Sequence, residues 1–422
     1  MLQIQYIREN REKVLEGLKI RNFKNPELIA QAILVDEERR KLQTETETIK
    51  SEANNLARRI GEHFKKGEKD QAEALKLETR LLKDKEKDID TKLSELTVSI
   101  HDILVQIPNI PYSLVKQGKS AEDNEEVFTS GPASSGTFAP HWEVAAKHKL
   151  IDFEAGNKIT GSGFPLYCNG GAKLQRALIN FFLDEAVKAG FSEYQTPLLV
   201  NEESAYGTGQ LPDKEGQMYH VTADNLYLIP TAEVPLTNIF RDVILKAEEL
   251  PLKITAYSSC FRREAGSYGS DVRGLNRLHQ FDKVEIVIVA HPDHSYNTLE
   301  MMVAHVKSLI EKLELPFRIL RLCGGDMGFT SAMTYDFEVF APGQSRWLEV
   351  SSVSNFETFQ ANRLKLRFRN EETKKTQLAH TLNGSALALP RIVAAILENH
   401  QTPEGIRIPA ALVPYTGFEI LK

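Results

Sequence analysis

The sequence has few cysteines, and no two of them have the close spacing of a metal-binding or redox motif. Cys168, Cys260 and Cys323 are the only three among 422 residues, and no CxxC pair occurs. An odd and scattered set argues against a disulfide framework and a structural zinc site, and it is typical of a reducing compartment. We therefore expect a cytoplasmic protein. Cys260 is expected to be a small buried strand residue rather than a nucleophile.

Long apolar runs and an excess of one charge are also missing. No stretch approaches the roughly 20 apolar residues of a membrane-spanning helix, and charged residues follow the N-terminal Met1-Leu2-Gln3-Ile4-Gln5 where a signal peptide would be apolar. The net charge is only −6, so no general basic field indicates a nucleic-acid partner. The sequence predicts no membrane association, and any RNA must bind a local surface.

The familiar glycine-rich nucleotide loops are absent as well. Gly161-Ser162-Gly163 and Gly207-Thr208-Gly209 lack the third glycine and the strand-to-helix context of a dinucleotide-binding loop, and there is no Walker sequence. We interpret both stretches as turns. Nucleotide binding would have to use other residues.

One segment does carry the residue types that a phosphate site needs. Arg262, Arg263 and Glu264 are adjacent, and Phe281 and Glu285 follow on an alternating, strand-like stretch. Guanidinium groups bind phosphate oxygens in a fixed geometry, an aromatic ring can stack on a base, and acids can bind a small cation. An Arg-Arg-Glu sequence can also be a solvated surface cluster. On these residues alone both interpretations remain open.

Residues 27–107 differ from the rest of the chain, being rich in Glu, Lys, Leu and Ala and free of proline. Apolar residues recur there every seven positions, first at Val35, Leu42, Ile49 and Leu56 and then at Leu75, Leu82, Ile89, Leu96 and Ile103. The pattern predicts two helices of about 35 residues, each on the order of 50 Å long, that pair as an antiparallel hairpin broken by Gly61 and Gly67. Such a hairpin can be a dimerisation coil, a spacer or a binding arm. The excess of Lys and Arg near its tip suits an RNA backbone, although a solvated turn is as common.

The remainder of the chain mixes strands and helices after Pro108 ends the second long helix. We predict strands at 194–200, 226–229, 254–261, 281–289 and 346–352, and helices at 174–189, 234–246, 294–313 and 390–400. Because the strands follow one another without regular βαβ alternation, the fold class is α+β, with an antiparallel sheet flanked by helices. The expected parts are a helical arm at 1–110, a linker at 111–136 and a mixed domain at 137–422.

Several of these segments together resemble the bacterial-type seryl-tRNA synthetases, a family of class II aminoacyl-tRNA synthetases. Residues 262–285 are similar to motif 2 of that class, 383–391 to motif 3, and 174–200, a helix followed by a strand with Pro197, to motif 1. Further matches occur in the family's order at Pro140-His141-Trp142, Thr231-Ala232-Glu233, Gly324-Gly325-Asp326-Met327-Gly328 and Glu349-Val350-Ser351-Ser352. The resemblance covers essentially the whole chain. It implies a tRNA-binding coiled-coil arm at 1–110 and a class II catalytic domain at 137–422.

The resemblance also implies the reaction and its partners. The carboxylate of L-serine would attack the α-phosphate of ATP, with Mg²⁺ present, to give seryl-adenylate, and the terminal ribose of tRNA-Ser would then accept the serine. The hairpin would grip the long variable arm of tRNA-Ser. The family further implies a homodimer formed through motif 1, charging of tRNA-Sec where that tRNA exists, and a loop at Ser267–Val272 that reorders between the two steps.

The residues that the resemblance assigns fall into overlapping sets. The catalytic residues would be Arg262, Arg391 and Glu349. L-Serine would be bound by Thr231, Ala232, Glu233, Arg262, Glu285, Asn383 and Ser385. ATP would be bound by Arg262, Arg263, Glu264, Leu278, Phe281, Glu349, Val350, Ser351, Ser352 and Arg391. Glu349 and Ser352 would hold the metal, although an acid at position 349 could equally belong to a structural ion pair.

Individual roles follow from the same resemblance. Arg262 would bind the α-phosphate and the serine carboxylate, and Arg391 would clamp the γ-phosphate. Glu264 would hold the adenine edge while Phe281 stacks on the ring. Thr231 and Glu233 would take the ammonium of serine, whereas Glu285 and Ser385 would read its hydroxyl.

Two other functions are compatible with part of the sequence. A class II-like ligase that charges a carrier protein would share the site, but such relatives lack the long helical arm. A catalytically inactive paralogue acting as an RNA-binding or dimeric scaffold would have lost Arg262, Glu285 or Arg391, and all three are present. Serine-dependent exchange of pyrophosphate into ATP separates these possibilities.

Overall fold

A computed structural model describes residues 1–131, 136–264 and 273–422. The chain divides into two compact units. One consists of Met1–Lys19 with Phe23–Pro108, and the other of Ile20–Asn22 with Asn109–Lys422. The predicted loop at Ser267–Val272 lies outside the described residues.

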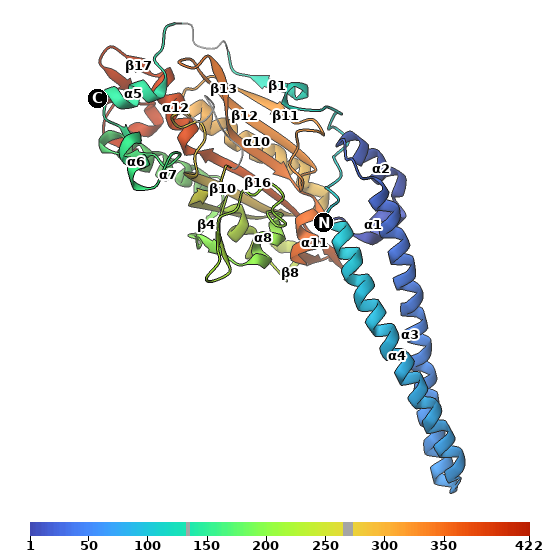
Figure 1. The fold of residues 1–422 in the computed structure, drawn as a ribbon. Helices are drawn as coiled ribbons and strands as arrows, with labels where there is room; N and C mark the ends of the chain where they lie inside the picture. Colours follow the sequence, from blue (N-terminus) through green and yellow to red (C-terminus); the bar gives the residue numbers. More distant parts are fainter. Residues whose placement is uncertain (132–135, 265–272) are drawn as a thin grey trace. The chain divides into compact units, whose positions relative to one another are not determined.

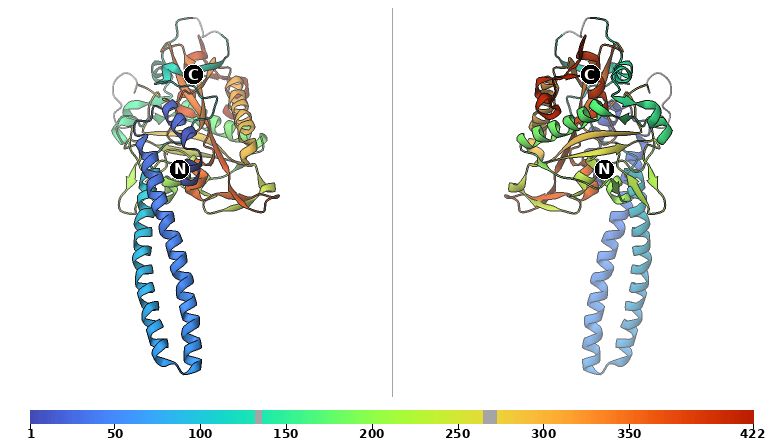
Figure 2. Two further views of the ribbon diagram at one scale, coloured as in Figure 1. Left: turned by 90° about the vertical axis from the view of Figure 1, so that its right-hand side faces the viewer. Right: turned by 90° about the vertical axis from the view of Figure 1, so that its left-hand side faces the viewer.

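The first unit is helical and contains the predicted hairpin. Its helices are α1 (Ile4–Glu9), α2 (Arg11–Ile20), α3 (Glu27–Lys66) and α4 (Lys69–Leu104). At 1.5 Å per residue, the 40 residues of α3 and the 36 of α4 extend about 60 and 54 Å, and Figure 2 shows the two helices running side by side. Every residue of the two predicted heptad series is buried or half-buried.

The predicted break at Gly61 is wrong, because α3 continues through that residue to Lys66. A glycine inside a helix costs only about 1 kcal/mol relative to alanine, which the packing of the apolar seam can offset. The helix ends instead at Gly67, whose φ of +79° is the left-handed conformation that glycine adopts readily.

A buried charge also organises this unit. Asp36 of α3 is fully buried, and its carboxylate accepts hydrogen bonds from Arg8 of α1 and from Arg39, one turn further along α3. The two ion pairs therefore connect a short helix to the long one. The heptad pattern gave no indication of them, since Asp36 does not belong to either apolar series.

The second unit is built on an eight-stranded sheet with the order β1-β11-β12-β13-β16-β10-β9-β4 (Figure 1). The strands are β1 (Glu125–Thr129), β4 (Ser192–Glu193), β9 (Leu252–Phe261), β10 (Gln280–Ala290), β11 (Phe317–Arg321), β12 (Met333–Ala341), β13 (Arg346–Asn355) and β16 (His380–Ala388). Neighbouring strands are antiparallel except for β4 and β9. This confirms the predicted α+β class with a mainly antiparallel sheet.

Helices cover both faces of this sheet. The longer ones, α7 (Asn169–Lys188), α10 (Ser295–Lys312) and α12 (Leu389–Asn399), share one apolar core with Ile286 and Ile288 of β10. The short helices α9 (Glu233–Asn238) and α11 (Thr358–Leu364) pack with Val287 and Val289, which alternate to the opposite face. Strand β10 is consequently buried on both sides.

Shorter elements complete the second unit. The helices are α5 (His141–Lys147), α6 (Phe153–Ile159), α8 (Glu202–Thr208) and α13 (Val413–Thr416). The strands are β2 (Ile151–Asp152), β3 (Leu166–Tyr167), β5 (Leu199–Val200), β6 (His220–Val221), β7 (Leu226–Leu228), β8 (Ile244–Lys246), β14 (Arg367–Arg369), β15 (Thr376–Leu378), β17 (Gln401–Thr402), β18 (Gly405–Arg407) and β19 (Ile420–Leu421).

Two predicted elements of this unit are wrong. The helix predicted at 234–246 ends at Asn238, and residues 244–246 form β8, which pairs in parallel with β14. The strand predicted at 194–200 is reduced to β5, and Pro197 belongs to no strand, since proline cannot donate to a ladder. In addition, β1 lies within the predicted linker and pairs with β11.

Other expectations agree with the structure. Cys260 is a fully buried residue of β9, as predicted, and all three cysteines are free. Among the residues that the structure describes, none of the helices combines the length and apolarity needed to cross a bilayer.

The ion pairs of Asp36 predict a measurable contribution to the stability of the arm. We expect Asp36→Asn to lower the free energy of unfolding by about 1–3 kcal/mol, because a buried acceptor of charged hydrogen bonds is replaced by a neutral amide. Urea unfolding followed by helical circular dichroism checks this. The control is Glu73→Gln, which removes an exposed pair with Lys76 and should change the value by less than about 1 kcal/mol. Equal effects of the two variants would contradict the prediction.

Candidate active site

Four polar side chains meet around one fully buried carboxylate, that of Glu285 on β10. Its Oε2 accepts a hydrogen bond from Thr231 Oγ1 at 2.9 Å, and its Oε1 accepts from Asn383 Nδ2 at 2.8 Å and from Ser385 Oγ at 3.3 Å. Lys283 forms an ion pair with the same carboxylate and donates to Thr231 Oγ1 at 2.9 Å. Strand pairing creates this cluster, since Glu285 lies directly opposite Ser385 of β16. The structure thus brings together four of the residues expected to bind serine.

Sequence reasoning missed Lys283. Its side chain is only 7% exposed, and its ammonium group balances the charge of Glu285. A buried carboxylate without a cation would carry a large desolvation penalty. The signal was present, because a lysine two positions before Glu285 on a strand must lie on the same face.

Glu233 is a second buried acid in the same region, at the start of α9. Its Oε1 accepts a hydrogen bond from Gln360 Nε2 at 2.7 Å. Burial raises the pKa of Glu233 to about 7, and the negative charge of Glu285 adds to this, whereas Gln360, Lys283 and Arg262 oppose it. The carboxyl group can therefore change its charge near neutral pH. Gln360 was also missed by sequence reasoning.

Thr231 and Glu233 are held together by the local backbone. The backbone N–H of Glu233 donates to Thr231 Oγ1 at 3.2 Å, and Ala232 between them is fully buried. The hydroxyl of Thr231 is thus fixed from three sides, by Glu233, Lys283 and Glu285. The three-residue stretch predicted from the sequence is a rigid corner of the site.

Arg262 and Phe281 lie against each other where β9 ends and β10 begins. The guanidinium carbon of Arg262 is 5.2 Å from the centroid of the Phe281 ring, and its backbone N–H donates to the carbonyl of His279 at 2.9 Å. The aromatic face and the cation expected at a nucleotide site therefore occur together. Leu278, beside them, is buried.

The next two residues expected to bind ATP have different surroundings from Arg262. Arg263 is exposed, and its backbone N–H donates to the carbonyl of Gln217 at 2.9 Å. Glu264 has a left-handed backbone with a φ of +47° and forms an ion pair with Arg277. A nucleotide base that approached the Glu264 carboxylate would compete with this pair.

The residues expected to hold a metal are brought together by a bulge in β13. Glu349 pairs with Glu338, whereas Ser351 pairs with Phe337, so that Val350 is the extra residue. An uninterrupted strand would place Glu349 and Ser352 on opposite faces. With the bulge, Ser352 Oγ lies 3.4 Å from Glu349 Oε1.

A third carboxyl group lies beside this pair. Asp336 of β12 faces Ser352 across the strands and accepts a hydrogen bond from its hydroxyl group. Burial raises the pKa of Asp336 well above its usual value, and the nearby charge of Glu349 raises it further. Sequence reasoning missed Asp336, because only strand pairing brings it next to residue 352.

These donors fit a hard divalent cation. All of them are oxygen atoms, and Mg²⁺ is usually held by one or two carboxylates together with substrate phosphates. No group of three or more His, Cys, Asp and Glu side chains with metal-binding geometry occurs in the described part of the chain. A metal at Glu349 and Ser352 would thus depend on oxygen atoms supplied by a ligand.

Arg391, near the start of α12, binds two backbone carbonyl groups, one of which belongs to Glu349. Its Nε donates to the carbonyl of Asn276 at 3.0 Å, and its Nη1 donates to the backbone carbonyl of Glu349 at 2.6 Å. The side chain is one-third exposed, so part of the guanidinium remains accessible to a ligand. Ser351, which is buried, links β13 to β16 by donating to the carbonyl of Ser385 at 2.6 Å.

The arrangement combines two different environments. A buried acidic pocket suits a small molecule with an ammonium group and a hydroxyl group. Next to it, two accessible arginines, an aromatic ring and oxygen donors for a metal suit a nucleoside polyphosphate. A site with both parts can bring an amino acid and a nucleotide phosphate into contact.

Comparisons with known proteins identify the same two parts of the chain. Residues 1–111 match the model of the seryl-tRNA synthetase N-terminal domain, and residues 219–400 match the class II core domain of tRNA synthetases for G, H, P, S and T. The serine–tRNA ligase of Salinibacter ruber is 50% identical over 99% of this chain and 98% of its own length. That of Desulfitobacterium hafniense is 46% identical over the full length of both. The crystal structure of seryl-tRNA synthetase from Pyrococcus horikoshii complexed with ATP is similar with a TM-score of 0.94 and 34% identity, covering 100% of this chain and 99% of that one.

The raised pKa of Glu233 predicts a particular dependence of stability on pH. Because its folded-state pKa of about 7 lies above the ordinary value, the folded protein binds the proton more tightly than the unfolded chain does. The free energy of unfolding should therefore fall as the pH rises from about 4.5 to 7, by up to about 3 kcal/mol, and stay level above that. Glu233→Gln should lack this fall.

Chemical unfolding of both proteins at several pH values between 5 and 8 tests this. Glu248→Gln, at a side chain that is 68% exposed, is the control and should follow the wild type. If Glu233→Gln and wild type lost the same stability between pH 5 and 7, the charge of Glu233 would not be the cause.

Proposed function

Because the chain belongs to the seryl-tRNA synthetase family, we propose that it activates L-serine with ATP to form seryl-adenylate and transfers the serine to tRNA-Ser. The observation that carries this proposal is the buried Glu285, which is surrounded by hydroxyl, amide and ammonium groups beside two accessible arginines. A carrier-protein ligase is disfavoured by the long helical hairpin. An inactive scaffold is disfavoured because Arg262, Glu285 and Arg391 are all present.

In this proposal the acidic pocket binds the serine. Glu233 and Thr231 receive the ammonium group, while Glu285 and Ser385 read the hydroxyl and Asn383 fixes the orientation of Glu285. Ala232 provides the tight backbone between the first two. Ionised Glu233 binds an ammonium group better than the protonated form does, so serine binding is coupled to loss of a proton near neutral pH.

The neighbouring cationic part binds ATP. Arg262 contacts the α-phosphate and the serine carboxylate, and Arg391 contacts the γ-phosphate. Phe281 stacks on adenine, and Glu264 holds the edge of the base. Arg263, Leu278, Val350 and Ser351 supply further contacts to the nucleotide. The serine carboxylate is itself the nucleophile, so these side chains act by positioning the reactants and stabilising charge.

Mg²⁺ would be held by Glu349 and Ser352 and would neutralise charge on the phosphates. The bulge in β13 supports this, because it places both oxygen donors on one side of the strand. The hydrogen bond from Ser352 to Asp336 would orient the hydroxyl oxygen of Ser352 toward a cation.

The rest of the chain has roles in tRNA recognition and assembly. Residues 1–110 form the tRNA-binding arm, 111–136 connect it, and 137–422 form the catalytic domain. Exposed basic residues near the turn of the hairpin are suited to the variable arm of tRNA-Ser: Arg58, Arg59, Lys65, Lys66 and Lys69. We further propose a homodimer formed through residues 174–200, charging of tRNA-Sec where that tRNA occurs, and a cytoplasmic location consistent with three free cysteines.

The proposed activity predicts serine-dependent exchange of labelled pyrophosphate into ATP, followed by charging of tRNA-Ser. Alanine should be activated on the order of 10⁴-fold less efficiently, because a site built to hydrogen-bond a hydroxyl leaves polar groups unpaired when the hydroxyl is missing. Exchange without charging of tRNA-Ser would favour a carrier-protein ligase. Absence of exchange would favour a scaffold and contradict the proposal.

Lys283 should be needed for serine binding. In Lys283→Met the charge of Glu285 stays buried without a cation, so we expect the free energy of unfolding to fall by about 3–5 kcal/mol and the KM for serine to rise much more than the KM for ATP. Steady-state exchange kinetics and urea unfolding measure these effects. Adding Glu285→Gln should restore part of the stability without restoring activity. A double variant as unstable as Lys283→Met would show that the ion pair is not the cause.

A further inference from the structure

We propose that the buried pair of His141 and Glu398 positions Arg391 for ATP by fixing Gly274–Asn276, the segment whose carbonyl group binds the arginine. Neither residue of the pair belongs to the expected site, and both side chains are fully buried. The inference rests on the proposed function, in which Arg391 contacts the γ-phosphate. His141 and Glu398 are positioning residues, because they act through the groups that they hold and do not themselves contact ATP.

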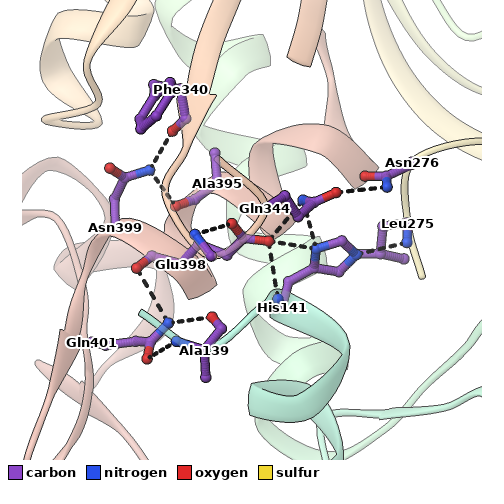
Figure 3. Close-up of polar contacts among 11 residues, drawn as sticks. Ala139, His141, Leu275, Asn276, Phe340, Gln344, Ala395, Glu398, Asn399 and Gln401 are labelled. Atoms are coloured by element: carbon purple, nitrogen blue, oxygen red, sulfur yellow. Dashed lines mark hydrogen bonds and ion pairs between the residues drawn. The ribbon is translucent and has the colours of Figure 1, made fainter. Parts of the chain in front are cut away.

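The carboxylate of Glu398 is held by four neutral N–H groups (Figure 3). Its Oε1 accepts from the backbone N–H of His141 at 3.0 Å, from His141 Nδ1 at 2.8 Å and from Gln344 Nε2 at 2.8 Å. Its Oε2 accepts from the backbone N–H of Gly343 at 2.9 Å. A buried carboxylate with this many donors has one orientation, and it fixes α5, which begins at His141, against α12.

The second ring nitrogen of His141 reaches the segment that enters β10. Nε2 accepts a hydrogen bond from the backbone N–H of Leu275 at 2.9 Å. Because Nε2 is an acceptor, the ring hydrogen must be on Nδ1, where it is donated to Glu398. Glu398 therefore sets both the orientation of the ring and its tautomer, and the ring in turn holds Leu275.

The segment lies directly on the imidazole ring. Gly274 has a φ of +67°, and a Cβ atom at this position would be 2.2 Å from His141 Nε2. No side chain can be accommodated there without moving the backbone. The absence of a side chain is thus what allows the Leu275 hydrogen bond to form.

A second connection runs through Asn276 and Gln344. Asn276 Nδ2 donates to Gln344 Oε1 at 2.7 Å, and Gln344 donates in turn to Glu398. Figure 3 shows Gln344 between Asn276 and Glu398. Asn276 is only 5% exposed, so its backbone is held by the ring on one side and by this amide on the other.

The backbone carbonyl of Asn276 is the group that binds Arg391 Nε at 3.0 Å. The guanidinium also contacts Glu349 of strand β13, through its backbone carbonyl and, at 4.0 Å, through its carboxylate. Gly274–Asn276 belong to no helix or strand and depend on His141 and Gln344 instead. Arg391 and Glu398 also lie seven residues apart on α12, so they are two turns apart on the same side of one helix.

These contacts predict a selective effect on ATP. In His141→Asn the amide can still donate to Glu398, but it is too short to accept from Leu275. We expect the KM for ATP to rise at least about tenfold while the KM for serine stays within about twofold. Isothermal titration with Mg-ATP should show the same fold-change in Kd, independently of turnover. The full-length protein is used throughout.

Gly274→Ala is a second variant that leaves every partner of Glu398 in place. The added methyl group should displace the segment from the ring and raise the KM and Kd for ATP in the same direction. His400→Asn is the matched control, because His400 is a buried histidine just after α12 whose ring contacts the carbonyl of Leu313 at 3.0 Å and has no bond to residues 274–276. It should lower stability without changing the ratio of the two KM values.

Two results would overturn the inference. One is an unchanged Kd for Mg-ATP in folded His141→Asn and Gly274→Ala. The other is an equal rise in the KM for ATP and serine in these variants and in His400→Asn, which would indicate a purely structural role. If the wild type lacked serine-dependent exchange, the proposed function would fail, and the Mg-ATP titrations of wild type and variants would still decide whether the pair positions Arg391.

Discussion

The register of β10 against β16 is the constraint on which the site depends. Glu285 lies opposite Ser385, and alternation places Lys283 on the same face while Ile286 points into the core on the other side. A shift by one residue would move the buried carboxylate into an apolar core without its donors, at a large cost in free energy. Correct packing of the sheet and correct assembly of the polar cluster around Glu285 are therefore the same event. The cost of burying Glu285 without its donors enforces both.

Three buried glutamates in this unit are stabilised in three ways, and each way has a functional consequence. Glu285 is paired with the ammonium group of Lys283 and accepts hydrogen bonds from three further side chains. Glu233 has no direct ion pair in the described contacts, and burial raises its pKa into the range where it can respond to a bound ammonium group. Glu398 is surrounded by neutral N–H donors, which give it a fixed orientation. The ion pair of Glu285 suits recognition of a ligand, and the raised pKa of Glu233 suits coupling of binding to a proton. The fixed orientation of Glu398 suits rigid positioning of its neighbours.

Predictability differed sharply between the two units. The arm could be derived from its heptad spacing because contacts within a helical hairpin follow a simple period, and only the effect of Gly61 was misjudged, since helix packing offset its cost. In the mixed unit, β9, β10 and β13 were located correctly, whereas β16, the strand that carries Asn383 and Ser385, was not predicted. The helix predicted at 234–246 was wrong because residues 244–246 find a strand partner more than a hundred residues away, which local propensity cannot reveal. Asp336 and Gln360 were overlooked because only the packing of distant segments brings them to Ser352 and Glu233, whereas Lys283 could have been found from its position two residues before Glu285.

By itself, the sequence determined the class of fold, the helical arm and the residues that resemble a known family, because these depend on local period and on residue identity. The tertiary structure decided which of them act together. A bulge at Val350 brings Glu349 and Ser352 to one side of a strand, and His141 meets Glu398 across 257 positions of the chain. Such contacts are set by strand register and by the packing of helices on the sheet, which satisfy buried charges at long range. No local pattern encodes that geometry, and so it became visible only in the folded chain.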